Sequence, residues 1–253
     1  MRRAWLGAAV PLALLLLWEG LWHVPGWRLE SISRPLDVVA ALARGLADGS
    51  IPRATVETFE AALFGFALAA AIGIGLGIVL GLLPRLERVV APSVDAMRPV
   101  PSVALIPLAL MLFGFGVNME ASVIAFACFW PILLVTIAAV RGIEPRLLEV
   151  ARVLQMSVRE RTLKIILPAA LARIAVGLRL ALAIALVVAV TVEIVLNPRG
   201  LGHSMMSAQQ ALRFDEMYAQ LLWIGLVGWA ISAAAQFALR WPRCDVGLGE
   251  VRT

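Results

Sequence analysis

Long apolar stretches separated by short polar segments dominate the chain from end to end. A helix needs about 20 apolar residues to cross the hydrocarbon core of a bilayer, and the stretches approach that length. They lack the strict alternation of transmembrane β-strands, which favours helices, whose backbone groups are hydrogen-bonded internally. The sequence therefore predicts an all-α integral membrane protein, with one transmembrane domain over residues 1–253 and six spans near residues 5–22, 57–83, 100–116, 121–140, 171–196 and 218–240.

The first stretch, residues 5–22, also admits a second interpretation. A basic start followed by an apolar centre is found in cleaved secretory signal peptides as well as in membrane spans. No small-x-small cleavage site follows it, and Trp18, Trp22 and Trp27 are spaced like an interfacial aromatic belt. We therefore expect residues 5–22 to form the first span.

The composition agrees with a membrane protein. Hydrophobic residues make up 61% of the chain and charged residues only 15%, whereas about a quarter of a soluble domain is charged. A formal charge of +5 would suggest nucleic-acid binding in a soluble protein. Here the basic side chains fall in short segments beside the spans, where they meet anionic membrane lipid, and the sequence has no separate basic domain for nucleic acid.

The distribution of arginine and lysine predicts the orientation. Short cytoplasmic loops carry the excess of basic residues. If the N-terminus is inside, most of the basic residues fall on the inner side, and a minority falls outside, namely Arg28, Arg34, Arg44, Arg53, Arg199 and Arg213. We therefore expect both termini of this multi-pass protein to be cytoplasmic.

Residues for catalysis, metal binding or ATP hydrolysis are scarce. Lys164 is the only lysine and no P-loop glycines precede it. The histidines are His23 and His203, and no zinc-ligand spacing is present. His203 lies beside Ser204, but the Gly-x-Ser-x-Gly motif of a hydrolase is not completed there. The sequence thus predicts no catalytic residue, no metal and no cofactor.

The segment 141–170, between the fourth and fifth predicted spans, has the pattern of two short helices. Ser157 and Glu160 are spaced as a capping box that starts the second helix, and we expect Pro168 to end it. The pair is either a lever that docks on a partner or an interfacial hairpin on the lipid headgroups. The first helix is amphipathic, with apolar residues recurring at helical spacing at Leu147, Leu148, Ala151 and Leu154.

Residues Glu149–Pro168 resemble the EAA motif of ABC importer permeases, which runs Glu-Ala-Ala, three residues, Gly, nine residues and Ile-x-Leu-Pro. Here Glu149-Val150-Ala151 is followed, at the same spacing, by Gln155 in the place of the glycine and then by Ile165-Ile166-Leu167-Pro168. The chain is similar to the branch of the family that serves sulfonate, taurine and nitrate importers. The similarity continues through Arg98–Gly116, Phe129–Arg152 and Pro198–His203.

The resemblance implies a type I ABC importer permease of the bacterial inner membrane, which forms a channel and is not itself an enzyme. Its loop would form coupling helices in a cleft of a cytoplasmic ABC ATPase, and a periplasmic or lipoprotein solute-binding protein would deliver the solute. A second permease copy, forming a homodimer, would complete the translocation path. The matched coupling residues are Glu149, Ala151, Arg152, Leu154, Gln155, Ser157, Ile165, Leu167 and Pro168.

Gln155 is the main departure from the motif. A glycine adopts a left-handed turn at little cost, whereas a glutamine is strained there. This strain favours a tighter or more helical turn between the two short helices. It also leads to the hypothesis that Gln155→Gly is tolerated or improves coupling.

The third predicted span carries candidates for the translocation path. Pro99, Pro101 and Pro107 remove backbone donors and favour a bend. Freed polar groups at such a break can line a transport pathway, which makes Arg98, Pro101 and Ser102 candidates. A packing kink is the other interpretation of the same prolines.

Glu193 is a further pathway candidate, because carboxylates inside a membrane face a cavity or a partner. Its nearness to Asn197 and Pro198 is equally consistent with a place at the outer interface. An outer amphipathic helix is predicted over residues 35–48, either as a docking place for the binding protein or as an interfacial helix without a partner.

Gly73, Gly77 and Gly81 lie on one face of the second predicted span, which favours close approach of a neighbouring helix over a dinucleotide-binding loop.

An ion-coupled secondary transporter that works without an ATPase is the alternative function. Such a protein would carry its own ion site among intramembrane acidic residues and broken helices. Binding of an ATPase to the chain decides between the two.

Overall fold

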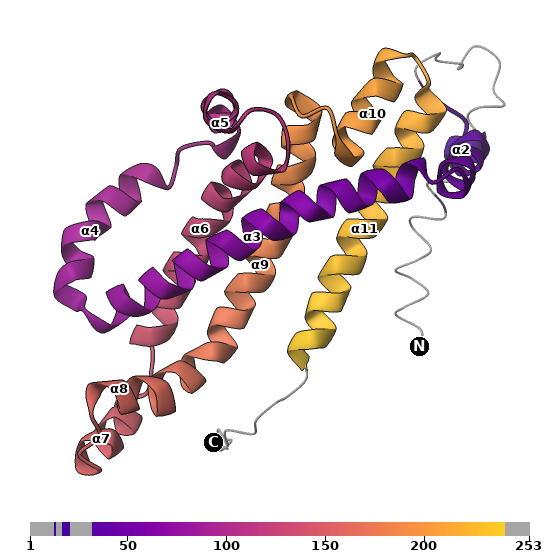
Figure 1. Ribbon diagram of the computed structural model, residues 1–253. Helices are drawn as coiled ribbons and strands as arrows, with labels where there is room; N and C mark the ends of the chain where they lie inside the picture. The colour runs from indigo at the N-terminus through magenta and orange to yellow at the C-terminus, as the bar shows by residue number, and fades with distance from the viewer. Residues whose placement is uncertain (1–12, 14–16, 21–31, 241–253) are drawn as a thin grey trace. The chain divides into compact units, whose positions relative to one another are not determined.

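The computed structural model describes residues 13, 17–20 and 32–240, and this part of the chain is helical (Figure 1). The first predicted span, 5–22, lies largely outside the described residues. The elements are α2 (Pro35–Ala47), α3 (Ser50–Leu82), α4 (Pro84–Met97), the 3-10 turn η1 (Ser102–Leu105), α5 (Ile106–Phe113), α6 (Val117–Arg141), α7 (Pro145–Val153), α8 (Val158–Arg161), the π-helical turn η2 (Thr162–Ile166), α9 (Leu167–Val195), α10 (Gly200–Gln210) and α11 (Phe214–Arg240).

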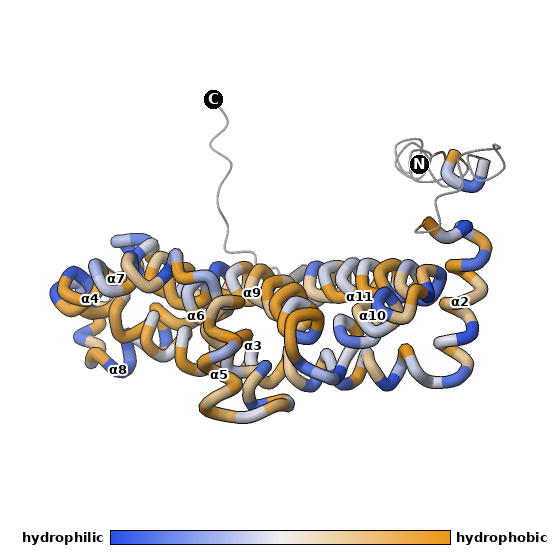
Figure 2. Tube along the Cα trace, turned by 90° about the horizontal axis from the view of Figure 1, so that it is seen from above, coloured by the Kyte–Doolittle hydropathy of each residue, from blue (hydrophilic) through white to orange (hydrophobic). Residues whose placement is uncertain are grey.

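Four helical segments of the described ranges are long and apolar enough to cross a bilayer, and a bent pair would add a fifth. In Figure 2 the long helices are mainly apolar in colour, whereas hydrophilic residues concentrate in the short helices and connections. The four segments are Ser50–Leu82, Val117–Arg141, Val158–Gln210 and Phe214–Phe237, and the bent pair is Pro84–Met97 with Ser102–Phe113.

The chain forms two compact units, each held together by its own internal contacts. Unit 1 comprises the described residues of 1–60 and 190–227, and unit 2 those of 61–189 and 228–253. In unit 1 an apolar cluster forms around the start of α3, where Ile51 and Ala54 pack with Leu201 of α10 and Trp223 of α11. Trp223 also donates a hydrogen bond from its indole Nε1 to Thr55 Oγ1 over 2.9 Å.

Glycines on α3 allow it to lie directly against α6 within unit 2. A Cβ atom at Gly77 would come within 2.5 Å of the Thr136 Cβ, and one at Gly73 within 2.9 Å of Ile132. Gly81 faces Val140 in the same way. The predicted role of this glycine face in helix packing is therefore confirmed, because a side chain at any of the three positions would force the helices apart.

Residues 100–116 do not form one straight span. The chain turns by 83° between α4 and the η1–α5 segment, and α5 has only 8 residues. Pro99, Pro101 and Pro107 all lie at or near this turn, where their missing N–H groups prevent a continuous helical ladder. The bend that the prolines favour is thus present. It lies at the start of the predicted third span, whose helical part is Ser102–Phe113.

Candidate functional site

The two short helices of the segment 141–170 pack against the core of unit 2. Ile166 at the end of η2 packs in one buried cluster with Val140 of α6 and Ile174 of α9, and Leu148 of α7 packs against that cluster. Arg173 also donates from Nη1 to the carbonyl of Gly142 over 3.0 Å, at the C-terminal end of α6. The base of the segment therefore has a fixed position on α6 and α9.

A left-handed glutamine joins the two short helices. Gln155 has φ +49°, so the expectation of a tighter or more helical turn was wrong. The amide of Met156 donates to the carbonyl of Ala151, and the amide of Gln155 donates to that of Arg152, both over 3.0 Å. This pair of bonds is a Schellman motif, whose hydrogen bonds hold the residue after the helix in the left-handed region even when it is not glycine.

Ser157 begins the second helix as the sequence predicts. Its hydroxyl accepts from the amide of Glu160, and the Glu160 carboxylate accepts from the amide of Ser157, which completes the capping box. The helix does not end at Pro168, however. The π-helical turn η2 precedes it and α9 continues directly from that turn, so the chain stays helical through the proline, whose missing N–H falls where the hydrogen-bond pattern changes.

Apolar side chains are exposed among the charged ones on this segment, which lies beyond the long helices of unit 2 (Figure 1). Leu148 and Ala151 turn inward, but Leu147 and Leu154 are exposed, so the four periodic apolar residues do not form one buried face. Glu149 is exposed and makes no ion pair with another residue in the described ranges. The exposed apolar side chains, which we call the outer face, are Leu147, Val150, Val153, Leu154, Val158 and Leu163.

Of the four predicted pathway residues, Arg98, Pro101 and Ser102 lie at one break in unit 2. Arg98, at the end of α4, and Ser102, in η1, line a cavity of about 310 Å³ in unit 2. Pro101 lies between them as the residue that precedes η1. Trp130 of α6 lines the same cavity and was not predicted, because an aromatic residue in an apolar span gives no signal of its own. Glu193 belongs to unit 1.

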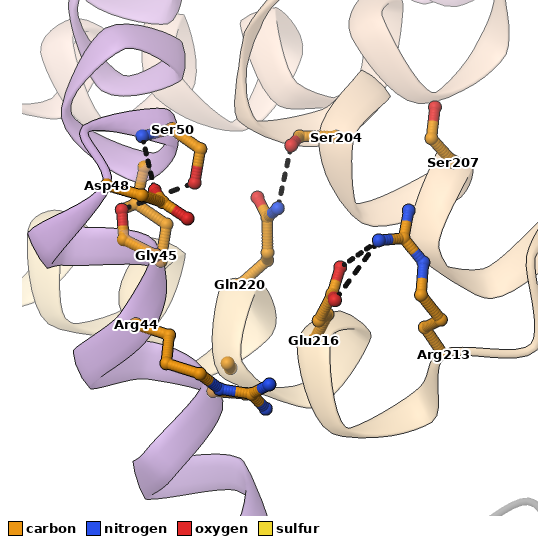
Figure 3. A pocket seen from close by; sticks show the side chains of 12 residues that line it. Arg44, Gly45, Asp48, Ser50, Ser204, Ser207, Arg213, Glu216 and Gln220 are labelled. Atoms are coloured by element: carbon orange, nitrogen blue, oxygen red, sulfur yellow. Dashed lines mark hydrogen bonds and ion pairs between the residues drawn. The ribbon is translucent and has the colours of Figure 1, made fainter.

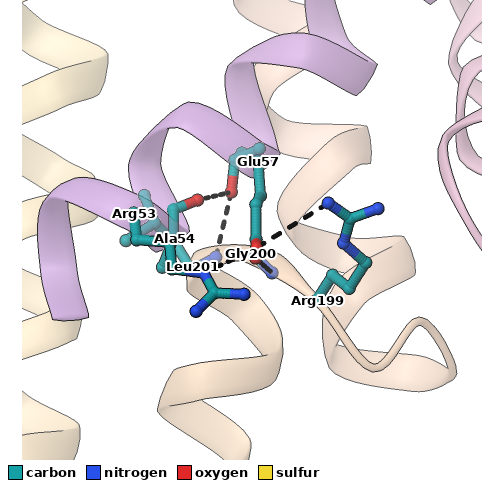
Figure 4. Close-up of polar contacts among 7 residues, drawn as sticks. Arg53, Ala54, Glu57, Arg199, Gly200 and Leu201 are labelled. Carbon is teal, nitrogen blue, oxygen red and sulfur yellow. Dashed lines mark hydrogen bonds and ion pairs between the residues drawn. The ribbon is translucent and has the colours of Figure 1, made fainter.

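Glu193 is buried, with 2% of its surface exposed, and it holds the first turn of α10. The amide of Gly202 donates to its Oε2 over 2.8 Å. The amide of Leu201 donates to Thr58 Oγ1 over 2.9 Å, and that of Gly200 donates to Glu57 Oε2 over 3.1 Å (Figure 4). Three side chains from α3 and α9 thus satisfy amides that a helix start leaves without intrahelical partners.

Glu57 also lies between two cations in this cluster. Its Oε1 is 3.3 Å from Arg53 Nε and 3.7 Å from Arg199 Nη2 (Figure 4). The carboxylates of Glu57 and Glu193 therefore complement the positive end of the α10 dipole. This geometry gives Glu193 a structural role at the start of α10. The sequence indicated only an acidic residue inside a predicted span, and not the amide that it binds.

A polar cavity of about 360 Å³ lies in unit 1 (Figure 3). Its arginines are already paired, because Arg44 contacts Asp215 and Arg213 contacts Glu216. At the edge of this cavity the carboxylate of Asp48 accepts a hydrogen bond from the backbone amide of Ser50 and is also hydrogen-bonded to the Ser50 hydroxyl. These hydrogen bonds lower the pKa of the Asp48 carboxyl. Its charges therefore offset one another.

His203 and Ser204 do not form a nucleophile–base pair. His203 Nε2 is 3.3 Å from Ser207 Oγ, one turn along α10. Ser204 Oγ accepts from the side-chain Nε2 of Gln220 over 2.7 Å, as Figure 3 shows. Because the two neighbouring side chains point to different partners, the geometry does not support a hydrolase.

Known proteins that resemble this chain are membrane components of transporters. A putative aliphatic sulfonates transport permease protein (SsuC) of Bacillus subtilis strain 168 is 31% identical over 229 residues, covering 90% of this chain and 83% of that protein. A bicarbonate transport system permease protein (CmpB) of Synechococcus elongatus is 31% identical, covering 93% and 89%. The taurine transport system permease protein (TauC) of Escherichia coli K12 is 29% identical over 72% of this chain and 64% of its own length.

Solved structures show the same fold. An inward-facing MetNI methionine ABC transporter contains a chain that matches 83% of this one and 98% of its own length, with a TM-score of 0.63 and 20% identity. The family model described as "binding-protein-dependent transport system inner membrane component" matches residues 73–241. With more than half of its length inside that match, the chain belongs to this family and is a permease subunit of an ABC importer.

Proposed function

We propose that the chain forms the translocation path for a small solute that carries an oxyanion group, such as a sulfonate, taurine, nitrate or bicarbonate. The relatives support this class, since they are known as permease proteins for aliphatic sulfonates, bicarbonate and taurine. In the proposal a homodimer of six-span subunits encloses the path, a solute-binding protein delivers the solute, and separate ABC ATPase subunits supply the energy.

The outer face of the segment 141–170 is the observation that carries the proposal. Val153 of α7 exposes 82% of its surface and Val158 of α8 exposes 68%. Apolar side chains exposed together on a rooted element favour a protein partner. The buried root at Ile166 and Leu148 gives this element a stiff connection to α6 and α9, as a coupling lever requires.

The orientation in the proposal follows from charge. The segment 141–170 carries Arg141, Arg146, Arg152, Arg159, Arg161 and Lys164, and basic residues accumulate on the cytoplasmic side of the inner membrane. An ATPase that uses cytoplasmic ATP would meet the outer face there, with both chain termini on the same side. Movement of the lever would be transmitted to α6 and α9 through their shared core.

Co-purification with candidate ATPases of the same organism tests the proposal. We expect the wild type to retain an ATPase and Glu149→Arg to lose it while still inserting in the membrane. Asp37→Arg on α2 is the matched control, because it reverses an exposed charge in unit 1 and should leave ATPase binding unchanged. If no form retains an ATPase and vesicles show ion-driven uptake, the chain is a secondary transporter and the proposal is wrong.

A further inference from the structure

The break between α4 and η1 carries an arrangement that the proposed function does not use. The cavity of about 310 Å³ beside it is lined by Arg98, Ser102 and Trp130, together with Val100, Phe126, Ala127, Pro131, Leu134 and Ile184. All of these residues belong to unit 2. The lining contains no carboxylate and has three hydrogen-bond donors among apolar side chains.

The three donors have no acceptor in the described part of the chain. The indole Nε1 of Trp130 is buried and unsatisfied. Arg98 makes no ion pair, and Ser102 makes no side-chain hydrogen bond, with any described residue. A buried N–H group without a partner is costly. Trp130 lines the cavity together with Arg98 and Ser102, whose donors also lack a partner among the described residues, and this combination points to an acceptor that the chain itself does not provide.

The position of the Trp130 indole is fixed by its neighbours. Its ring packs edge to face against Phe126 and Phe129, with centroids 5.6 and 4.8 Å away. It also packs against the buried cluster of Leu80, Val94, Leu133 and Ile137. A donor held in this way loses little side-chain entropy when it binds an acceptor.

The arginines of the unit 1 cavity differ from Arg98 in their ion pairing. There Arg44 and Arg213 are each paired with a carboxylate, so that cavity offers no free positive charge to an anion. At the break, the guanidinium of Arg98 has no such neighbour in the lining. One unpaired cation, a hydroxyl and an indole N–H match the charge and the acceptor oxygens of an oxyanion.

We propose that Arg98, Ser102 and Trp130 form a subsite for the oxyanion group of the solute, such as a sulfonate, nitrate or carbonate group. Size agrees with this assignment, since a volume of roughly 30 Å³ per water leaves room for the anion and part of its hydration shell. Breaks in spanning helices place polar groups beside transported solutes in other transporters. The subsite rests on the proposed function, because only a permease for anions has a use for it.

The test is an anion titration of the detergent-solubilised full chain with ¹⁵N-labelled tryptophan indoles. Loss of one signal in Trp130→Phe assigns the Trp130 resonance. We expect sodium methanesulfonate, nitrate or bicarbonate to shift this resonance saturably, and neutral dimethyl sulfone not to shift it. Arg98→Gln should weaken the binding by at least about tenfold, as expected for a charge-assisted hydrogen bond. Arg88→Gln, on the same helix and exposed, is the matched control and should bind normally.

Several outcomes would overturn the subsite. These are the absence of a saturable shift with all three anions, equal binding by Arg98→Gln, and a shift produced only by dihexanoyl phosphatidylglycerol, which would assign the cavity to a lipid headgroup. The titration needs no ATPase and is repeated with Glu149→Arg. Loss of ATPase binding with an intact indole titration therefore separates a failure of coupling from a failure of the subsite.

Discussion

The amide of Gly202 donates to the buried carboxylate of Glu193 over 2.8 Å, and this bond joins the start of α10 to the end of α9. We expect Glu193→Ala to lower the stability of the solubilised protein by about 2 kcal/mol, because a buried amide loses a charged acceptor. Glu193→Gln retains an acceptor oxygen and should lose less. Thermal unfolding in detergent measures both.

Glu60→Gln is the control for these variants, since Glu60 is exposed on α3 and also belongs to unit 1. It should unfold like the wild type. A Glu193→Gln protein with normal stability and no solute uptake would instead return Glu193 to the translocation path.

Gly200 allows a second test of the contacts around the Glu193 carboxylate. Its φ is +87°, and a Cβ there would collide with the Glu193 carboxylate. Gly49 has a similar φ of +82° but open space around the added carbon. We expect Gly49→Ala to cost roughly 1–2 kcal/mol from backbone strain alone, and Gly200→Ala to cost clearly more. Equal losses of thermal stability in the two variants would contradict the close contact with Glu193.

Local patterns allowed the elements of the coupling segment to be predicted, while long-range contacts were not visible in the sequence. Ser157 and Glu160 were recognised because a capping box involves residues three apart. The partnership of Thr58 with Leu201 joins residues 143 positions apart, and no spacing rule reports it. The same limit hid Trp130, whose importance depends on where the break after α4 places Arg98.

Two errors have local physical causes. Pro168 was expected to end a helix, but the π-helical turn before it moves the proline into the first turn of α9. Gln155 was expected to avoid the left-handed region, yet the Schellman hydrogen bonds keep it there. In both cases a backbone arrangement several residues long outweighed the preference of one residue.

The close contact between α3 and α6 can be tested with a control two residues away on the same helix. We expect Gly77→Ala to destabilise the protein by roughly 1–3 kcal/mol, because its methyl group would overlap Thr136 and the carbonyl of Leu133. Gly75→Ala should be neutral or slightly stabilising, since nothing lies within 4 Å of the added carbon. Thermal unfolding of the pair in the same detergent is the measurement. If the two variants unfold alike, α3 and α6 are not packed as closely as the structure shows.

Gln155→Gly should relieve backbone strain at the turn between α7 and α8. Glycine accepts the φ of +49° without the roughly 1 kcal/mol that a side chain adds in the left-handed region, and the Schellman bonds remain available to it. We expect slower amide hydrogen exchange at Met156 and unchanged or tighter ATPase binding. Gln155→Val is the opposing control, because a branched Cβ is least compatible with this conformation. It should speed amide hydrogen exchange at Met156 and weaken ATPase binding. A Gln155→Gly protein that assembles with the ATPase but loses ATP-driven uptake would mean that the glutamine side chain itself takes part in coupling, since relief of backbone strain alone cannot remove transport.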